Sequence, residues 1–229
     1  MRKILHTLAV LSLLLPLACK QAPDRFDLNE FRHPSTTYRT MSFWSLNDSL
    51  SADEMCRQLT LFQEGGFGGA FFHSRPGLLT PYLSEEWFDM MEAGVRASQD
   101  LGLESWFYDE DKWPSGFAGG IVPRQDDAFR ARTLVRVPAG TAISPEDSVL
   151  LDDGTHLYVA HVDPMGQPWY NGTCWVDLMN PDAVRAFIEC TYKPYAERFA
   201  GRKGVRGIFS DEPQVSPRRD VTEADAFIP

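Results

Sequence analysis

Two short acidic segments of the sequence hold the residue types best suited to proton transfer. FYDEDKWPSG places Asp109, Glu110 and Asp111 directly after an apolar run, and VRGIFSDEP does the same with Asp211 and Glu212. A carboxyl group shielded at the end of a buried strand can have a raised pKa and donate a proton. Glycoside hydrolysis uses two carboxyl groups across the scissile bond. The two segments therefore predict a polar site in which strand ends supply the acids.

Side-chain alternation along an extended chain decides which acids face that site. Asp211 and Glu212 would point in opposite directions, so we expect Glu212 to be the catalytic acid and Asp211 to contact substrate. A structural alternative is that Glu212 caps or ion-pairs a following helix. Three adjacent acids cannot all point inward on this reasoning, so Asp109 and Glu110 are assigned to the site and Asp111 to the surface. Asp109 and Glu110 could instead hold a hard cation such as calcium, or be solvated.

Three further residues are candidates for substrate contact. Trp113 begins the segment WPSG, which reads as a tight turn that would present the indole as a platform for a sugar ring. His73 and Arg75 follow the apolar run GGAFF. An arginine offers several donors to hydroxyl or carboxylate groups. A lone histidine more often has a structural role. The position of His73 at the end of a predicted strand makes substrate contact an equal alternative.

The elements that must position these residues alternate regularly along the chain. Strand-like runs are followed by helical runs with N-cap signals, such as Ser51, Ser84 and Asn180 followed by Pro181. The predicted strands lie in segments 38–47, 67–74, 103–111 and 205–213, and the predicted helices in 51–66, 84–102 and 180–201. Such alternation with short links predicts parallel βαβ units.

Period-two alternation with turn residues takes over at about 128–164 and predicts a small antiparallel β insertion after the third strand. The remainder fits an α/β fold of the (β/α)8 TIM-barrel type with only its first four strand–helix units. A small doubly wound sheet is the alternative. In both folds, sites form at the carboxyl ends of the strands, where the acidic segments lie.

The N-terminus resembles an export signal. Residues 1–19 combine Arg2 and Lys3 with an apolar run and end at Cys19, as in a bacterial lipoprotein signal peptide with a lipidated cysteine. Ordinary signal cleavage is the alternative. Residues 20–37 would form a polar tether and 38–229 the partial barrel. We expect an exported protein of the bacterial cell envelope, in the outer membrane or periplasm, whose membrane contact is a lipid anchor.

The charge of the chain argues against a nucleic-acid partner, and its cysteines show no metal-binding or redox motif. The 229 residues carry a formal net charge of −10 without clustered Lys and Arg, which argues against nucleic acid. Apart from Cys19, the cysteines are Cys56, Cys174 and Cys190. Without a C-x-x-C motif they are expected to be small buried side chains, with a Cys174–Cys190 disulfide as the alternative.

Four segments together resemble a known family. FWSLN, EGGFGGAFFHSRPGLLTPYLSEEWF, LGLESWFYDEDKWPSGFAGG and GIFSDEP are similar to the N-terminal half of the catalytic barrel of glycoside hydrolase family 106, the α-L-rhamnosidases. The resemblance implies a (β/α)8 barrel, an inverting mechanism, an oligo- or polysaccharide substrate and a calcium ion whose ligands stay unassigned. It also implies that Glu212 is the general acid and that His73, Arg75, Asp109 and Glu110 line the sugar pocket.

Members of that family are far longer than this chain and carry a complete barrel. We therefore expect an N-terminal fragment of an exported glycoside hydrolase, with little or no catalysis by itself. The alternative is a non-catalytic, lipid-anchored half barrel that binds carbohydrate. A metal-dependent hydrolase fits less well, because barrels of that class often carry His-x-His after the first strand, and this strand ends in WSLND.

Overall fold

The computed structural model describes residues 26–215 and divides the chain into two units, Met1–Ser35 and Thr36–Pro229. In the first unit the described residues form the short helix α2 (Leu28–Arg32), whose N-cap Asp27 accepts the backbone N–H groups of Asn29 and Glu30. Cys19 and the predicted signal peptide lie outside the described residues. Within residues 26–215, no helix has the length and apolar content needed to span a membrane.

The second unit contains a parallel sheet of four strands, which confirms the predicted mixed α/β class. The strands lie in the order β1 (Met41–Leu46), β2 (Gly69–Ser74), β3 (Glu104–Tyr108) and β7 (Val205–Phe209). A Cβ atom at Gly69 would lie 2.0 Å from the carbonyl oxygen of Glu104, so β2 and β3 can pair this closely only with glycine there.

Four helices connect these strands, and their ends follow the predicted caps. Ser51 caps α3 (Ala52–Glu64), Ser84 caps α4 (Glu85–Leu101), and Asn180 with Pro181 begins α5 (Pro181–Cys190). A short break at Thr191 separates α5 from α6 (Tyr192–Phe199). Pro194 explains the break, because it has no N–H to donate to the carbonyl of Cys190.

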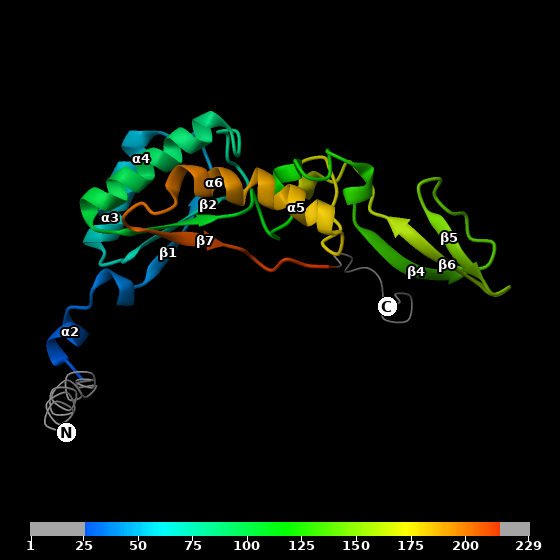
Figure 1. Ribbon diagram of the computed structural model, residues 1–229, viewed down its shortest axis with the longest axis horizontal. Helices are drawn as coiled ribbons and strands as arrows, with labels where there is room; N and C mark the ends of the chain where they lie inside the picture. The colour runs from blue at the N-terminus through cyan, green and yellow to red at the C-terminus, as the bar shows by residue number, and fades with distance from the viewer. Residues whose placement is uncertain (1–25, 216–229) are drawn as a thin grey trace, which may run out of the picture. The chain divides into compact units, whose positions relative to one another are not determined.

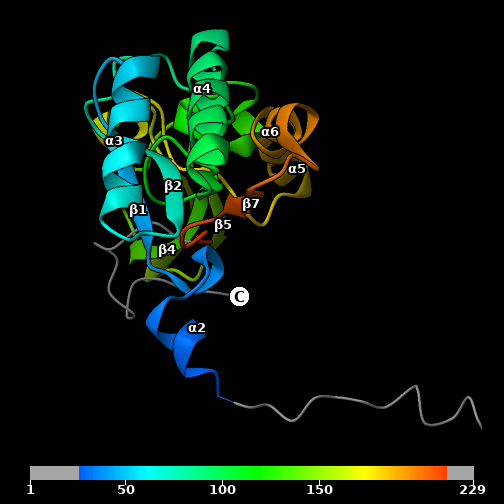
Figure 2. The same ribbon diagram turned by 90° about the vertical axis from the view of Figure 1, so that its left-hand side faces the viewer.

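Helices α3, α4 and α6 lie on one face of the sheet, as Figures 1 and 2 show. Alternate strand residues such as Trp44, Phe72 and Phe107 pack there against Leu59 and Met91 of the helices. Full burial of each such side chain contributes about 1.5–3 kcal/mol. This core fixes the four strands and therefore the position of their carboxyl ends.

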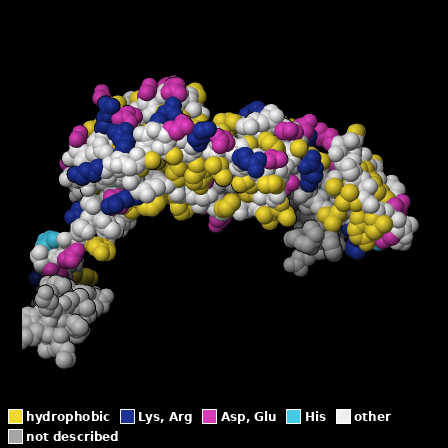
Figure 3. Space-filling view, viewed as in Figure 1, with side chains coloured by type: hydrophobic (Ala, Val, Ile, Leu, Met, Phe, Trp, Pro, Cys, Tyr) yellow, Lys and Arg dark blue, Asp and Glu magenta, His cyan; other side chains and the backbone are white. Residues whose placement is uncertain are grey.

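The opposite face of the sheet carries a row of aromatic rings in mutual contact. Its members are Phe43, Phe71, His73, Trp106, Tyr108 and Phe209. Phe43 and Phe209 remain 41% and 37% exposed. Figure 3 shows hydrophobic side chains gathered around the place where Figure 1 draws β7.

The predicted antiparallel insertion is also confirmed. Strands β4 (Arg132–Pro138), β5 (Ser148–Asp152) and β6 (His156–Val162) form a separate sheet in the order β4-β6-β5. Short 3-10 helices lie at Thr36–Tyr38, Ala118–Gly120, Asp127–Phe129 and Pro168–Tyr170. The first of them explains why β1 begins at Met41 rather than at Tyr38 as predicted.

The cysteine predictions are partly wrong. Cys174 is buried and Cys190 is half-buried, but Cys56 is exposed on α3. All three are free thiols, so the Cys174–Cys190 disulfide is not formed. Burial raises the pKa of the Cys174 thiol to about 11 and that of Cys190 to about 12, which leaves both thiols protonated and unreactive at neutral pH.

Candidate functional site

The carboxyl ends of β2, β3 and β7 lie at one edge of the sheet, because the three strands are parallel neighbours. Every site residue predicted within the described part of the chain follows one of these strands or ends it. The candidates are His73 and Arg75 at β2, Asp109, Glu110 and Trp113 after β3, and Asp211 and Glu212 after β7. We call this set the strand-end cluster.

Glu110 is fully buried, and its carboxylate is turned into the loop that follows β3. One oxygen accepts the backbone N–H groups of Asp111 and Gly119 at 2.8 and 2.6 Å, and the other accepts those of Gly116 and Ala118 at 3.0 and 2.7 Å. Burial raises the pKa of Glu110, and the four N–H donors oppose that rise because each binds the ionised form better. These contacts give Glu110 a direct role in holding residues 116–119.

Asp109 is buried beside it and is bonded to two hydroxyl groups. Ser115 Oγ donates to Oδ1 at 2.5 Å, and Tyr192 Oη donates to Oδ2 at 2.8 Å. Burial raises the pKa of Asp109, against these two hydrogen bonds. The carboxylate therefore joins the loop after β3 to the first turn of α6.

Ser115 connects the end of β3 to the end of β7. Its Oγ donates to Asp109 and accepts the N–H of Asp211 at 2.8 Å, and its own N–H donates to the carbonyl of Asp211 at 2.9 Å. The hydroxyl of Tyr108 adds a second link, since it donates to Asp211 Oδ2 at 2.9 Å. Asp211 is half-buried and held on both sides by these contacts.

Glu212 is the exposed acid of the strand-end cluster. Its backbone has a φ of 45°, a left-handed conformation that costs a residue other than glycine about 1–2 kcal/mol. The indole Nε1 of Trp113 donates to Glu212 Oε2 at 3.0 Å, so the two predicted residues meet across the edge of the sheet. The backbone carbonyl of Trp113 in turn accepts the indole N–H of Trp169 at 2.7 Å.

His73 and Arg75 occupy different surroundings from the acids. The ring of His73 is fully buried, with its centre 3.7 Å from that of Tyr108 and 4.4 Å from that of Phe43, and neither ring nitrogen has a hydrogen-bond partner. Burial, and to a lesser degree the charge of Arg75, lowers the pKa of His73 to about 3, so the ring is neutral. The Arg75 guanidinium lies 5.9 Å from the centre of the Phe43 ring.

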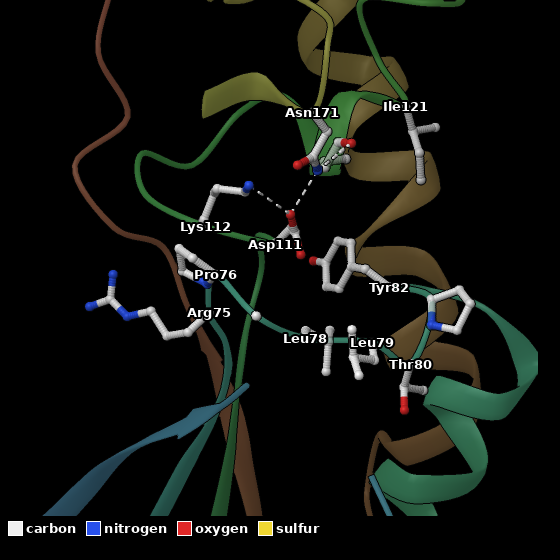
Figure 4. A pocket seen from close by; sticks show the side chains of 14 residues that line it. Arg75, Pro76, Leu78, Leu79, Thr80, Tyr82, Asp111, Lys112, Ile121 and Asn171 are labelled. Carbon is white, nitrogen blue, oxygen red and sulfur yellow. Dashed lines mark hydrogen bonds and ion pairs between the residues drawn. The ribbon is translucent and has the colours of Figure 1, made fainter. Parts of the chain in front are cut away.

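The assignment of Asp111 to the surface is wrong. Asp111 is 8% exposed, accepts Ser74 Oγ at 2.8 Å and Asn171 Nδ2 at 2.8 Å, and lines a pocket of about 370 Å³. All three acids after β3 are buried, because the chain bends after Tyr108 and the alternation of an extended strand no longer applies. Figure 4 shows Asp111 near the centre of this pocket, between Lys112, Asn171 and Tyr82.

Several residues around these strand ends were not predicted. Ser115 and Tyr192 bond to Asp109, Trp169 bonds to the backbone of Trp113, and Asn171 bonds to Asp111. Ser115 lies inside the quoted WPSG segment and could have been found there. The other three lie 56 to 83 positions along the chain from their partners, and no local pattern indicates the contacts.

The described residues contain no group of three or more His, Cys, Asp or Glu side chains arranged to hold a metal ion. Both oxygens of Asp109 and of Glu110 already accept hydrogen bonds from protein groups. The calcium ion therefore stays a prediction without assigned ligands.

Comparison with known proteins gives distant likenesses among solved structures. No protein-family model and no curated protein matches the chain. Among solved structures, a rhamnosidase from Novosphingobium sp. PP1Y is similar, with a TM-score of 0.39 and 19% sequence identity. The match covers 54% of this chain and 12% of that one, and a likeness of this size carries no argument about fold or function.

Proposed function

We propose that this chain is the first part of the barrel of an exported glycoside hydrolase of the α-L-rhamnosidase type, in which Glu212 is the general acid. The observation that carries the proposal is the pair of Glu212 and Trp113 at the carboxyl edge of the parallel sheet. An exposed carboxylate beside an indole is suited to sugar chemistry, since the acid can protonate a leaving oxygen and the ring face can pack on a pyranose.

Two features support this choice of acid, and a third indicates the class of sugar. Asp109 and Glu110 have their oxygens bonded to protein donors, whereas Glu212 is exposed and accepts the indole N–H of Trp113. Its left-handed backbone conformation is a strain of the kind that gathers at functional sites. The N-terminal resemblance to the family 106 motifs FSDEP and YDEDKWPSG adds the sugar class, α-L-rhamnosides of polysaccharides.

The full barrel, the partner carboxylate and the calcium ion belong to the same proposal. Within it, Arg75 and Asp211 bind substrate hydroxyl groups beside Trp113, and His73, Asp109 and Glu110 hold the strand ends in place. Export and lipidation at Cys19 deliver the protein to the cell envelope, where polysaccharide is the substrate.

The test uses the full-length enzyme of which this chain is proposed to be the first part, with 4-nitrophenyl α-L-rhamnopyranoside as substrate. We expect Glu212→Gln to lower kcat/KM at least about 100-fold, because general acid catalysis contributes a factor of that order or more. Glu189→Gln, which changes an exposed acid on α5, is the matched control and should leave the rate unchanged. A Glu212→Gln protein with the wild-type rate would reject the proposal.

A second candidate is a carbohydrate-binding half barrel without catalysis. It is favoured by the use of Asp109 and Glu110 as structural bonds, which removes two of the predicted strand-end acids from contact with substrate. Binding of methyl α-L-rhamnopyranoside without hydrolysis of the aryl glycoside would select this candidate.

A further inference from the structure

The pocket beside Asp111 is distinct from the place where Trp113 and Glu212 meet. It lies between the loop after β2 (residues 75–82) and the loop after β3 (residues 111–121), and Asn171, from the segment between β6 and α5, closes it. Neither Trp113 nor Glu212 lines it. Its volume of about 370 Å³ falls at the small end of the range for ligand pockets, about 300–1,000 Å³.

One polar atom in this pocket has no partner in the protein. Tyr82 Oη is buried, and no described residue forms a hydrogen bond with it. Figure 4 shows the Tyr82 hydroxyl directed toward Asp111. Burial and the nearby carboxylates raise the pKa of Tyr82, so the hydroxyl keeps its proton and can donate it. A buried hydroxyl without a bond is costly to the fold, and such a group therefore requires an explanation.

The charges in the pocket indicate a neutral ligand. Lys112 Nζ lies 3.9 Å from Asp111 Oδ2, and both side chains are only 12% exposed, so a positive and a negative group offset each other. Arg75 also lines the pocket, and Figure 4 shows its side chain extending away from Tyr82. A free anion would lie close to the like charge of Asp111, and a free cation would lie close to the like charge of Lys112.

The remaining surface of the pocket is mixed in a way that suits a sugar ring. Lys112 and the Tyr82 hydroxyl supply donors, and Asp111 supplies acceptor lone pairs, whereas Asn171 Nδ2 already donates to Asp111 and to the carbonyl of Gly119. Leu78, Leu79 and Ile121 supply an apolar side. Adjacent hydroxyl groups need donors and acceptors within one small space, and the apolar face of the ring needs such a wall.

We propose that this pocket is a second sugar subsite, which binds a single neutral pyranose ring through Asp111, Lys112 and Tyr82. It deepens the proposed function and rests on it for the class of ligand. With a subsite here and another at Trp113, the chain would hold two sugar units of one oligosaccharide.

The test is a titration of the ¹⁵N-labelled chain with methyl α-L-rhamnopyranoside, followed by NMR. The side-chain amide of Asn171 reports on the pocket, and the indole N–H of Trp113 reports on the other site. We expect the Asn171 signals to shift, and Tyr82→Phe to weaken this binding about ten-fold by removing one well-placed hydrogen bond. Lys112→Met, which keeps the aliphatic stem, is a second variant with the same expectation.

Stability separates a binding role from a structural one. Because Tyr82 Oη has no partner in the protein, Tyr82→Phe should leave the Tm unchanged or raise it. Tyr38→Phe is the matched control, since Tyr38 is 74% exposed and lies outside the pocket. It should change neither Tm nor binding.

The outcomes distinguish this inference from the proposed function. Shifts at Trp113 alone, with binding indifferent to Tyr82→Phe, would overturn the second subsite and leave the proposed function standing. Equal shifts of Asn171 with glycerol would overturn it as a nonspecific polyol effect. If no signal shifts, the subsite is rejected, and the aryl rhamnoside assay with Glu212→Gln decides the proposed function independently.

Discussion

The acids after β3 and the acid Glu212 after β7 give the same sequence signal but lie in opposite environments. Asp109, Glu110 and Asp111 are buried, and each accepts at least two hydrogen bonds from protein groups. Glu212 is exposed, has a strained backbone and bonds to one indole. An acidic strand end can therefore build a loop or present a charge, and the number of internal donors separates the two uses.

Glu110→Gln should produce the largest effect of this comparison. Each carboxylate oxygen accepts two backbone N–H groups, so in either orientation the amide NH2 would face two donors. We expect a loss of about 3 kcal/mol in the free energy of unfolding, measured by urea denaturation, since buried donors would be left unpaired.

Glu189→Gln on the exposed surface of α5 is the control for this change and should stay within about 0.5 kcal/mol of the parent. A loss equally small for Glu110→Gln would mean that the loop does not depend on the carboxylate. The distinction between the two acidic segments would then fail.

Ser115→Ala tests the link between the two segments and should rank second. The change removes the donor to Asp109 Oδ1 and the acceptor of the Asp211 N–H. Two buried hydrogen bonds are lost, so we expect about 2 kcal/mol of destabilisation in the same urea assay.

The helix α4 offers a matched control for Ser115→Ala. Ser98 is also fully buried, but its Oγ has no hydrogen-bond partner. Ser98→Ala should therefore be neutral or slightly stabilising. Equal losses in the two variants would show that burial of the hydroxyl, rather than its bonds to the strand ends, sets the cost.

The contrast between the segments also explains what could be predicted from the sequence. Caps at Ser51, Ser84 and Asn180 and the apolar periodicity are local signals, and they predicted the helices, the four parallel strands and the insertion. Alternation predicted that the three acids after β3 cannot all point inward, and it failed at Asp111 because the chain bends after Tyr108. The hydrogen bond from Asn171 to Asp111 joins residues 60 positions apart, so no local pattern in the sequence predicts it.

The end of β2 holds a buried titratable group, His73, whose ring nitrogens have no hydrogen-bond partner. The folded pKa of His73 is about 3, below the value of about 6.5 for an unperturbed histidine, so the unfolded chain binds a proton that the folded chain does not. Stability from this group is present above pH 6.5 and is lost as the pH falls toward 3.

We therefore expect the parent chain to lose about 2 kcal/mol between pH 7 and pH 5 through His73, measured from urea midpoints at each pH. His73→Phe, which keeps a ring beside Phe43 and Tyr108, should remove this part of the pH dependence. His33→Gln replaces an exposed histidine and should retain it. If the pH dependence of stability were unchanged in His73→Phe, His73 would be accessible to protons in the folded chain.

Glu212→Gly should have the smallest effect and the opposite sign. Glycine adopts a φ of 45° without the steric cost that glutamate meets, whereas the change loses the bond from Trp113 and increases the entropy of the unfolded chain. We expect a net gain of roughly 0.5 kcal/mol, with Glu212→Gln near zero because it keeps the strained backbone. A gain in stability on removal of Glu212 would agree with the proposed role of this residue as general acid, because its strained conformation would then serve no structural purpose. If Glu212→Gly instead lost more than about 1 kcal/mol, Glu212 would be a structural acid like Glu110, and the strand end after β7 would no longer single out a catalytic group.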